Sequence, residues 1–159
     1  MNMNMKLNLW KRFLIYGCIG LVLEVTYTGL DSLLRGDFSM AGKTFLVMLP
    51  IYGLAVALEP FHRALISYPW WLRGLTYLAL IWAIEYSSGS ILQFLLGSCP
   101  WHYRDSLNIN GFITLKMAPE WFCAGLGFEY VHNYLVKISA APRHAFPFKY
   151  LPMGKLRNE

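Results

Sequence analysis

Long apolar stretches separated by short polar breaks dominate the chain. Four of them reach the roughly 20 residues that a helix needs to cross a bilayer, and they span 13–34, 44–67, 72–96 and 111–137. Charged residues, Gly and Pro interrupt the pattern between them. The pattern predicts an all-α, polytopic integral membrane protein: a four-helix transmembrane bundle with an extracytoplasmic loop between the third and fourth helices.

Composition supports a membrane location. Of the 159 residues, 56% are hydrophobic and only 14% are charged, against about 25% charged residues in soluble domains. So little polar surface cannot cover so much apolar volume, which argues against an ordinary soluble domain. The net charge is +5, but the basic residues lie between apolar blocks and form no basic stripe, so the expected partner is the lipid bilayer and not nucleic acid.

The distribution of Lys and Arg predicts an orientation. With four crossings both termini lie on one side, and ten of the 14 basic residues fall there, three fall on the other side, and Lys116 lies within the fourth stretch. By the positive-inside rule both termini are cytoplasmic. The predicted organisation is a cytoplasmic N-terminus (1–12), a transmembrane domain (13–137) and a basic cytoplasmic tail (138–159).

Five of the nine acidic residues lie inside the apolar stretches, although a charge at the bilayer centre costs at least about 2.5 to 3.5 kcal/mol. At about 1.5 Å per residue, three of them lie roughly 14 to 20 Å deep. Helical spacing places further polar side chains on the same faces. The candidate polar-cavity residues are therefore Glu24, Glu85, Glu120, Lys116, Tyr27 and Gln93.

Local spacing also predicts pairings. Lys116 lies four residues before Glu120 and is its expected partner. Glu59 is followed one turn later by His62 and Arg63, which predicts an interfacial, snorkelling pair. The spacing leaves the role of the fifth acid, Glu129, open.

Three interpretations of the buried acids remain open. They could hold the helices in register through hydrogen bonds or ion pairs, line a cavity for an ion, a proton or a polar substrate, or bind a metal in a membrane enzyme. The chain has no His-x-x-x-His, Gly-x-Ser-x-Gly or Cys-x-x-Cys motif, and Gly42-Lys43-Thr44 lacks the first Gly of a phosphate-binding loop. We therefore predict no catalytic residue, no metal ligand and no cofactor.

The loop before the fourth stretch is rich in polar and aromatic residues. It is either an interfacial anchor or an entrance over the carboxylates. The residues that would form this entrance are Trp101, His102, Tyr103, Arg104 and Asn110.

Several motifs resemble known families. They include Tyr16-x-x-x-Gly20-x-x-x-Glu24-Val25, Ile51-Tyr52-Gly53, Trp82-x-x-Glu85-Tyr86-x-x-Gly89, Cys99-Pro100-Trp101-x-Tyr103, Asn110-Gly111-x-Ile113-Thr114-Leu115 and Trp121-Phe122-Cys123. From about Arg12 to Tyr134 the chain resembles the transmembrane protein 229 family of eukaryotes and the related bacterial family described as putative ABC-transporter type IV permease. The resemblance implies a small multi-pass membrane protein; the families usually carry an acid at the position of His102 and often one at that of Lys116.

The leading functional prediction is a permease-like or ion-coupled transport component with a carboxylate-lined interior. A transporter subunit would need an ATPase partner, because the chain has no nucleotide-binding motif, and four helices make a homo-oligomer plausible. The alternatives are a non-catalytic scaffold or interaction subunit and a membrane-embedded, lipid-modifying enzyme.

Overall fold

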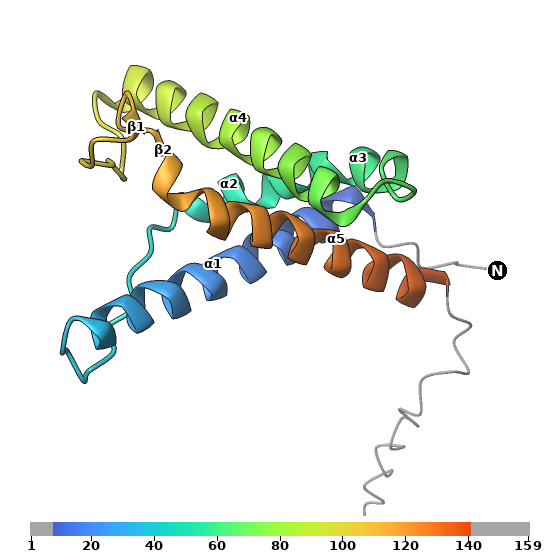
Figure 1. Ribbon diagram of the computed structural model, residues 1–159, viewed down its shortest axis with the longest axis horizontal. Helices are drawn as coiled ribbons and strands as arrows, with labels where there is room; N and C mark the ends of the chain where they lie inside the picture. The colour runs from blue at the N-terminus through green and yellow to red at the C-terminus, as the bar shows by residue number, and fades with distance from the viewer. Residues whose placement is uncertain (1–7, 141–159) are drawn as a thin grey trace, which may run out of the picture.

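The computed structural model describes residues 8–140, and most of this range is helical (Figure 1). The long helices are α1 (Leu9–Leu34), α4 (Trp70–Leu96) and α5 (Ala118–Ala140). Between α1 and α4 lie α2 (Met48–Gly53), the 3₁₀ helix η1 (Leu54–Leu58) and α3 (Glu59–Ala64). Between α4 and α5 lie the strands β1 (Asn108–Ile109) and β2 (Ile113–Thr114) and the 3₁₀ turn η2 (Leu115–Met117). The predicted, mostly helical fold is confirmed, although the short antiparallel hairpin of β1 and β2 was not predicted.

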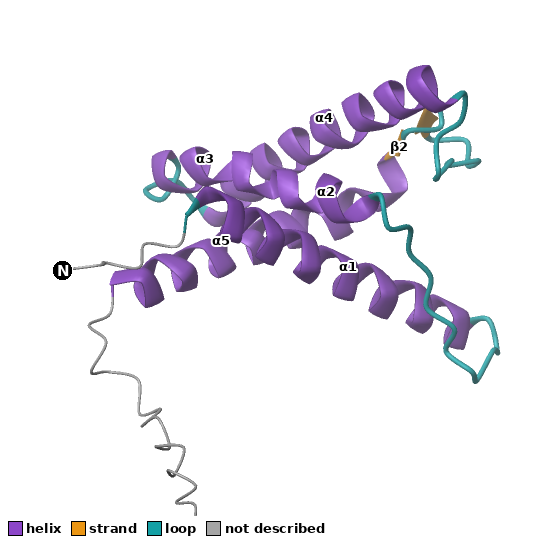
Figure 2. Ribbon diagram, turned by 180° about the vertical axis from the view of Figure 1, so that it is seen from behind, coloured by secondary structure: helices purple, strands orange, loops and turns teal. Residues whose placement is uncertain are grey.

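The helices meet at one end of the molecule and separate toward the other. α1 packs against α2 and η1, whereas α4 packs against α5. Figures 1 and 2 show α1 and α4 converging at the end where both begin and diverging toward the loops that follow them. Side chains from α1, η1, α4 and α5 form the core, and its buried members are Tyr16, Ala55, Leu58, Ile81, Phe128 and Leu135.

Within residues 8–140, α1 and α4 are the helices that are both long and apolar enough to cross a membrane. Large apolar side chains on them remain exposed, for example Val22 at 65% and Phe94 at 87%. Such a surface is unfavourable in water and suits a lipid environment.

Both helices begin slightly earlier than predicted. The Asn8 side chain accepts a hydrogen bond from the Lys11 amide at 3.0 Å and caps α1. α4 follows directly after Pro69 and ends at Gly97, whose φ of 70° is the left-handed conformation that glycine adopts easily.

The second apolar stretch, predicted as one helix over 44–67, is a helix interrupted by the 3₁₀ segment η1. Its helical part runs from Met48 to Ala64 and passes through η1. Pro60 has no amide hydrogen for the carbonyl of Val56, and the Glu59 amide bonds that carbonyl in the tighter 3₁₀ pattern instead. The prediction of a continuous helix was wrong because proline interrupts the hydrogen-bond ladder.

The fourth helix was predicted to begin at Gly111 but begins at Ala118. Asn110 and Gly111 adopt positive φ angles of 53° and 75° in the turn between β1 and β2. Ile113, after this turn, is buried at 8% exposure and belongs to β2, so it does not extend the helix. Pro119 consequently lies in the first turn of α5, where its missing amide costs nothing. Of the predicted tail 138–159, the part from residue 141 lies outside the described residues.

Candidate functional site

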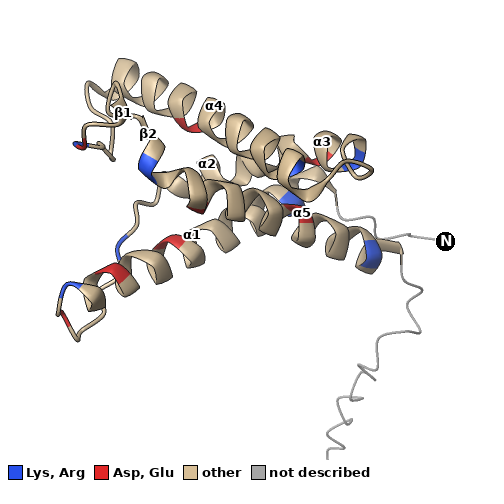
Figure 3. Cartoon of the chain, in the orientation of Figure 1, with Lys and Arg blue, Asp and Glu red and all other residues tan. Residues whose placement is uncertain are grey.

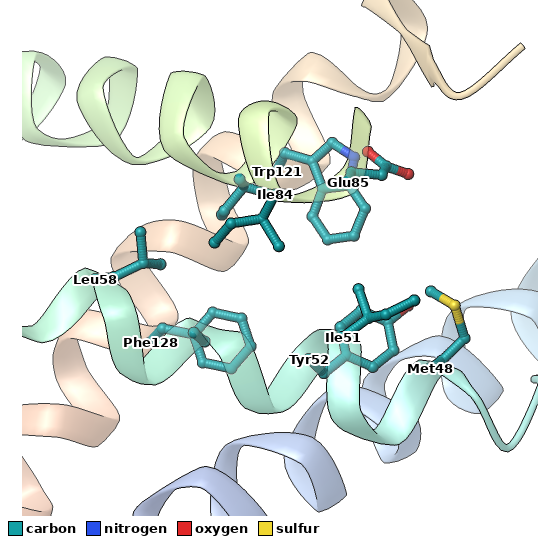
Figure 4. A pocket seen from close by; sticks show the side chains of 10 residues that line it. Met48, Ile51, Tyr52, Leu58, Ile84, Glu85, Trp121 and Phe128 are labelled. Atoms are coloured by element: carbon teal, nitrogen blue, oxygen red, sulfur yellow. The ribbon is translucent and has the colours of Figure 1, made fainter. Parts of the chain in front are cut away.

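Glu85 is a buried carboxylate without a cation. It lies in the middle of α4 and is only 4% exposed. The Tyr103 hydroxyl donates a hydrogen bond to Oε1 at 2.9 Å, and Oε2 has no hydrogen-bond partner among the described residues. The Trp121 indole lies beside the carboxylate (Figure 4) without a hydrogen bond of standard geometry. The polar groups beside Glu85 are therefore neutral donors, the Tyr103 hydroxyl and the Trp121 indole, and neither adds a positive charge.

Glu24 occupies a comparable environment on α1. It is partly buried and accepts a hydrogen bond from the Thr44 hydroxyl. The segment that carries Thr44 is fastened to α1 because the Lys43 amide donates to the Thr28 hydroxyl at 2.8 Å. Gly20, one turn before Glu24, lets the Tyr52 ring approach so closely that a Cβ at this position would overlap it.

A small cavity lies between α2, η1, α4 and α5. Its volume is about 30 Å³, which holds one or two water molecules or a small ion. Apolar and aromatic side chains form most of its wall, and Glu85 contributes the acid (Figure 4). The lining residues are Met48, Ile51, Tyr52, Ala55, Leu58, Ile81, Ile84, Glu85, Trp121 and Phe128.

Tyr103 connects the two acids electrostatically. Burial raises the pKa of its hydroxyl far above the ordinary value, and Glu85, Tyr52 and Glu24 add to the effect. Tyr103 therefore remains a neutral donor at any physiological pH, and it lies within electrostatic range of both carboxylates. We call Glu24, Thr44, Tyr52, Glu85 and Tyr103 the loop-end cluster; no ion pair to either of its acids is found within residues 8–140.

The opposite end of the bundle contains acids that are paired with arginine. Arg12 binds Glu59 Oε2 at 2.7 Å, and the Tyr16 hydroxyl donates to Oε1 at 3.0 Å. In the same way Arg73 pairs with Glu129, which also accepts a hydrogen bond from the Tyr77 hydroxyl at 2.8 Å. Figure 3 shows acidic and basic segments close together at this end.

Two buried histidines lie between these groups. The rings of His62 and His132 are 5.4 Å apart, and both residues are at most 2% exposed. Together with six residues of the two ion-paired groups, they form what we call the termini-end cluster: Arg12, Tyr16, Glu59, His62, Arg73, Tyr77, Glu129 and His132. The predicted snorkelling pair of Glu59 with His62 and Arg63 was wrong: Glu59 is buried, at 4% exposure, and pairs with Arg12 of another helix.

The other predicted cavity residues separate into two groups. Tyr27 and Glu120 lie near the loop end, where the Tyr27 hydroxyl is 3.7 Å from the Met117 sulfur and one buried oxygen of Glu120 lacks a partner. Gln93 instead caps α4 through the Gly97 carbonyl at 3.0 Å. Lys116 is exposed in η2 and forms no ion pair with Glu120, because the helix that would align them begins only at Ala118.

The predicted entrance loop folds over the loop-end cluster. The Trp101 indole donates to the Phe112 carbonyl at 3.0 Å, and Asn110 donates to the Tyr86 hydroxyl at 2.7 Å. The His102 ring packs against Gly111, where a Cβ would overlap it, and Arg104 is exposed. Tyr103 alone among the predicted loop residues contacts a buried acid directly.

Each cluster contains pairs of equivalent residues because the chain carries an internal repeat, which was missed in the sequence. Residues of α1 recur in α4 at a constant offset of 61, as Arg12 and Arg73, Tyr16 and Tyr77, and Glu24 and Glu85. Residues of α3 recur in α5 at an offset of 70, as Glu59 and Glu129 and His62 and His132. Comparing the chain with itself would have revealed these pairs. We call 9–64 the first half and 70–140 the second half.

The described residues contain no group of three or more His, Cys, Asp and Glu side chains arranged to hold a metal ion. The acids of the termini-end cluster are occupied by arginine, and those of the loop-end cluster by hydroxyls. The arrangement is suited to charge compensation at one end and to exchange of a proton or a small cation at the other.

The two long apolar helices, α1 and α4, point to a helical membrane protein. Residues 11–148 match the family described as putative ABC-transporter type IV, and the chain belongs to this family. The predicted resemblance to the bacterial family is confirmed, whereas that to the transmembrane protein 229 family stays a prediction. No solved structure matches the chain.

Proposed function

We propose that the protein is a permease-like, ion-coupled component of a membrane transport system, in which Glu85 binds and releases a proton or a small cation. The unpartnered Oε2 atom of Glu85 carries the proposal, since this side chain is buried beside a cavity and has no arginine, lysine or histidine partner in the described chain. An isolated buried carboxylate is costly as an anion. It therefore favours the bound state of a proton or cation, and Glu24 is placed to share that charge.

The proposed topology has four crossings with both termini in the cytoplasm. Helices α1 and α4 are apolar enough to span the bilayer, and α5, with 23 residues, is long enough. The broken helix of α2, η1 and α3 would form the remaining crossing. Non-helical backbone is tolerated at membrane depth where it is buried in protein or lines a cavity, as η1 does here.

The family description supports a partner in addition to the lipid. An ABC-type system needs an ATPase, and the chain carries no phosphate-binding motif. We propose that the ATPase is a separate subunit and that the protein forms its complex, or a homo-oligomer, within the bilayer.

A scaffold or interaction subunit is the second candidate. The termini-end cluster favours it, because its buried ion pairs join helices of each half without leaving a carboxylate free. Buried ion pairs of this kind can fix the register of packed helices without any role in transport. This role predicts that the protein moves no ion and remains bound to a stable partner.

Ion flux in liposomes tests the leading proposal. The full chain, purified with any subunit that remains bound, is reconstituted around a pH-sensitive dye, and flux is measured under a proton gradient and under sodium and potassium gradients. We expect Glu85→Gln to lower the flux at least tenfold while the protein stays folded by size-exclusion chromatography.

The matched control is Asp31→Asn on α1, whose carboxylate is half-exposed in an ion pair with Arg35. This variant is expected to keep the wild-type flux. Equal flux through the wild type and Glu85→Gln, or a wild type no more permeable than empty liposomes under every gradient, would reject the proposal and favour the scaffold.

A further inference from the structure

The histidines of the termini-end cluster contact the opposite half of the repeat. Each Arg–Tyr–Glu group lies within one half: Arg12, Tyr16 and Glu59 in the first, Arg73, Tyr77 and Glu129 in the second. The histidine contacts cross between the halves. His132 of the second half has Nδ1 3.5 Å from Glu59 Oε1, and the His62 ring of the first half meets the Tyr77 ring edge to face at 4.8 Å.

Four side chains of the cluster keep buried nitrogens without hydrogen-bond partners: Arg12 and Arg73 at Nε, and the two histidines. Both arginines are already bound to glutamate through Nη1, so the histidine rings are the least satisfied members of the cluster. Both ring nitrogens of His62 and the Nδ1 atom of His132 lack hydrogen-bond partners in the described chain, although the side chains are almost completely buried. Buried polar groups are normally paired. The unpaired ring nitrogens therefore mark a place where one more hydrogen bond can form.

A proton bound to His132 would supply the missing hydrogen bond between this histidine and Glu59. Glu59 is held by Arg12 at Oε2, so that Oε1 faces Tyr16 and His132. With a proton on Nδ1 the ring donates to that oxygen. When Nε2 carries a proton as well, the ring is cationic and the charge-assisted hydrogen bond is about twice as strong as a neutral one. No rearrangement of the backbone is needed beyond closing the present 3.5 Å separation.

The surrounding charges limit the site to one proton. The two arginines neutralise the two glutamates, so the neutral histidines leave the cluster without net charge. The rings of His62 and His132 are 5.4 Å apart, and two positive charges at this distance in a buried site repel strongly. The carboxylate is near His132 and not near His62, which therefore remains the neutral member.

We propose that His132 binds a proton at the interface between the two halves and that the bound proton closes this end of the bundle by a charged hydrogen bond to Glu59. The charged and titratable groups that contact the histidines are Glu59 of α3 and Tyr77 of α4. Behind them, Arg12 and Tyr16 of α1 bind Glu59, and Glu129 of α5 binds Tyr77 and Arg73 of α4. The site is separate from Glu85, and it stands whether or not Glu85 conducts an ion.

Histidine titration by NMR tests the site directly. The full chain carries four histidines, at positions 62, 102, 132 and 144. With ¹⁵N-labelled imidazoles in nanodiscs, His102→Gln and His144→Gln simplify the spectrum. We expect one buried histidine, absent from the spectrum of His132→Asn, to gain a proton at Nδ1, and the His62 signals to stay neutral over the same range.

Glu59→Gln supplies the decisive comparison. It removes the acceptor charge but keeps the shape, and is expected to weaken proton binding at His132 at least tenfold. The matched control is Glu129→Gln, the repeat-related acid that does not face His132, with a shift of less than threefold. If either variant fails to fold, His62→Phe in its place should change proton binding at His132 by less than threefold, because the ring that is removed carries no charge.

The contact between the halves gives an independent readout. In a double-mutant cycle of Glu59→Gln and His132→Asn, the coupling factor in the unfolding equilibrium constant should be at least fivefold larger below the titration midpoint of His132 than above it. No buried histidine titrating, an unchanged proton affinity in Glu59→Gln, a pH-independent coupling factor, or stoichiometric metal at the cluster would each overturn the proposal.

Discussion

The two ends of the bundle carry acids at repeat-related positions but compensate them differently. At the termini end, Glu59 and Glu129 each receive an arginine and a tyrosine. At the loop end, Glu24 and Glu85 receive only hydroxyl groups, from Thr44 and Tyr103. A hydroxyl donates a hydrogen bond but adds no charge, so the first pair of acids is neutralised and the second is not.

Because of this difference, we expect the acids paired with arginine to contribute to the stability of the fold and the unpaired acids to exchange a proton or a cation. Removing one partner of a buried ion pair leaves an uncompensated charge and costs about 3 to 5 kcal/mol. Neutralising an acid that has no cationic partner removes a desolvation cost and leaves its hydrogen bonds in place. The same type of side chain is therefore expected to behave oppositely at the two ends.

The largest expected effect follows from Arg73→Met. It leaves Glu129 buried with the Tyr77 hydroxyl as its remaining donor, and we expect a loss of about 3 to 5 kcal/mol in the free energy of unfolding. Thermal and denaturant unfolding in detergent measure it. The control is Arg35→Met, whose exposed ion pair with Asp31 contributes about 0 to 1 kcal/mol.

Adding Glu129→Leu to Arg73→Met should recover most of the lost stability, because the orphaned charge disappears. A double variant as unstable as Arg73→Met alone would show that the ion pair acts through packing and not through charge.

Glu85→Gln is expected to have a much smaller effect on stability, within about 1 kcal/mol, since the amide oxygen still accepts the Tyr103 hydrogen bond. The comparison is sharpest when this variant and Arg73→Met are unfolded under the same conditions. A loss equal to that of Arg73→Met would place Glu85 among the structural acids.

Tyr103→Phe removes the donor and is expected to cost about 1 kcal/mol at neutral pH. Its effect on alkaline stability is a separate signature. Because the pKa of Tyr103 is raised by burial above the ordinary value of 10.0, the unfolded chain ionises first as the pH rises, and stability is lost above pH 10. The phenylalanine variant should lose less stability in this range, as unfolding measured from pH 8 to pH 11 would show; an identical decline would contradict the buried position of the hydroxyl.

The smallest effect concerns a surface acid with hydroxyl partners. Hydrogen bonds from Ser39 and Ser32 hold the pKa of exposed Asp37 below its ordinary value of 3.8. Ser32→Ala, which removes a 2.9 Å hydrogen bond, should raise that pKa, so that the small stability contribution lost on acidification is lost at a higher pH. Carboxyl NMR measures the shift. No change would indicate that the hydrogen bonds from Ser39 are sufficient to lower the pKa of Asp37.

Part of the site could be predicted from local pattern. The depth of Glu24 and Glu85 in apolar segments was visible, and both lie where the structure leaves them without cations. The pairings of Glu59 and Glu129 were missed because their partners, Arg12 and Arg73, lie 47 and 56 residues away. Spacing along one helix reveals only neighbours on that helix.

The sequence by itself determined that the chain is helical and suited to a membrane, since long apolar runs favour helices and lipid whatever their packing. It also determined the position of α4 closely and that of α1 within a few residues, because Asn8, Pro69 and Gly97 act on their own backbone neighbourhood. Tertiary structure alone decided that residues 111–117 fold into a hairpin and a turn, that Lys116 is separated from Glu120, and that arginines pair with the buried acids at one end only. The reason is physical: a helix can be read from local propensity, whereas charge compensation depends on distances between segments that only packing sets.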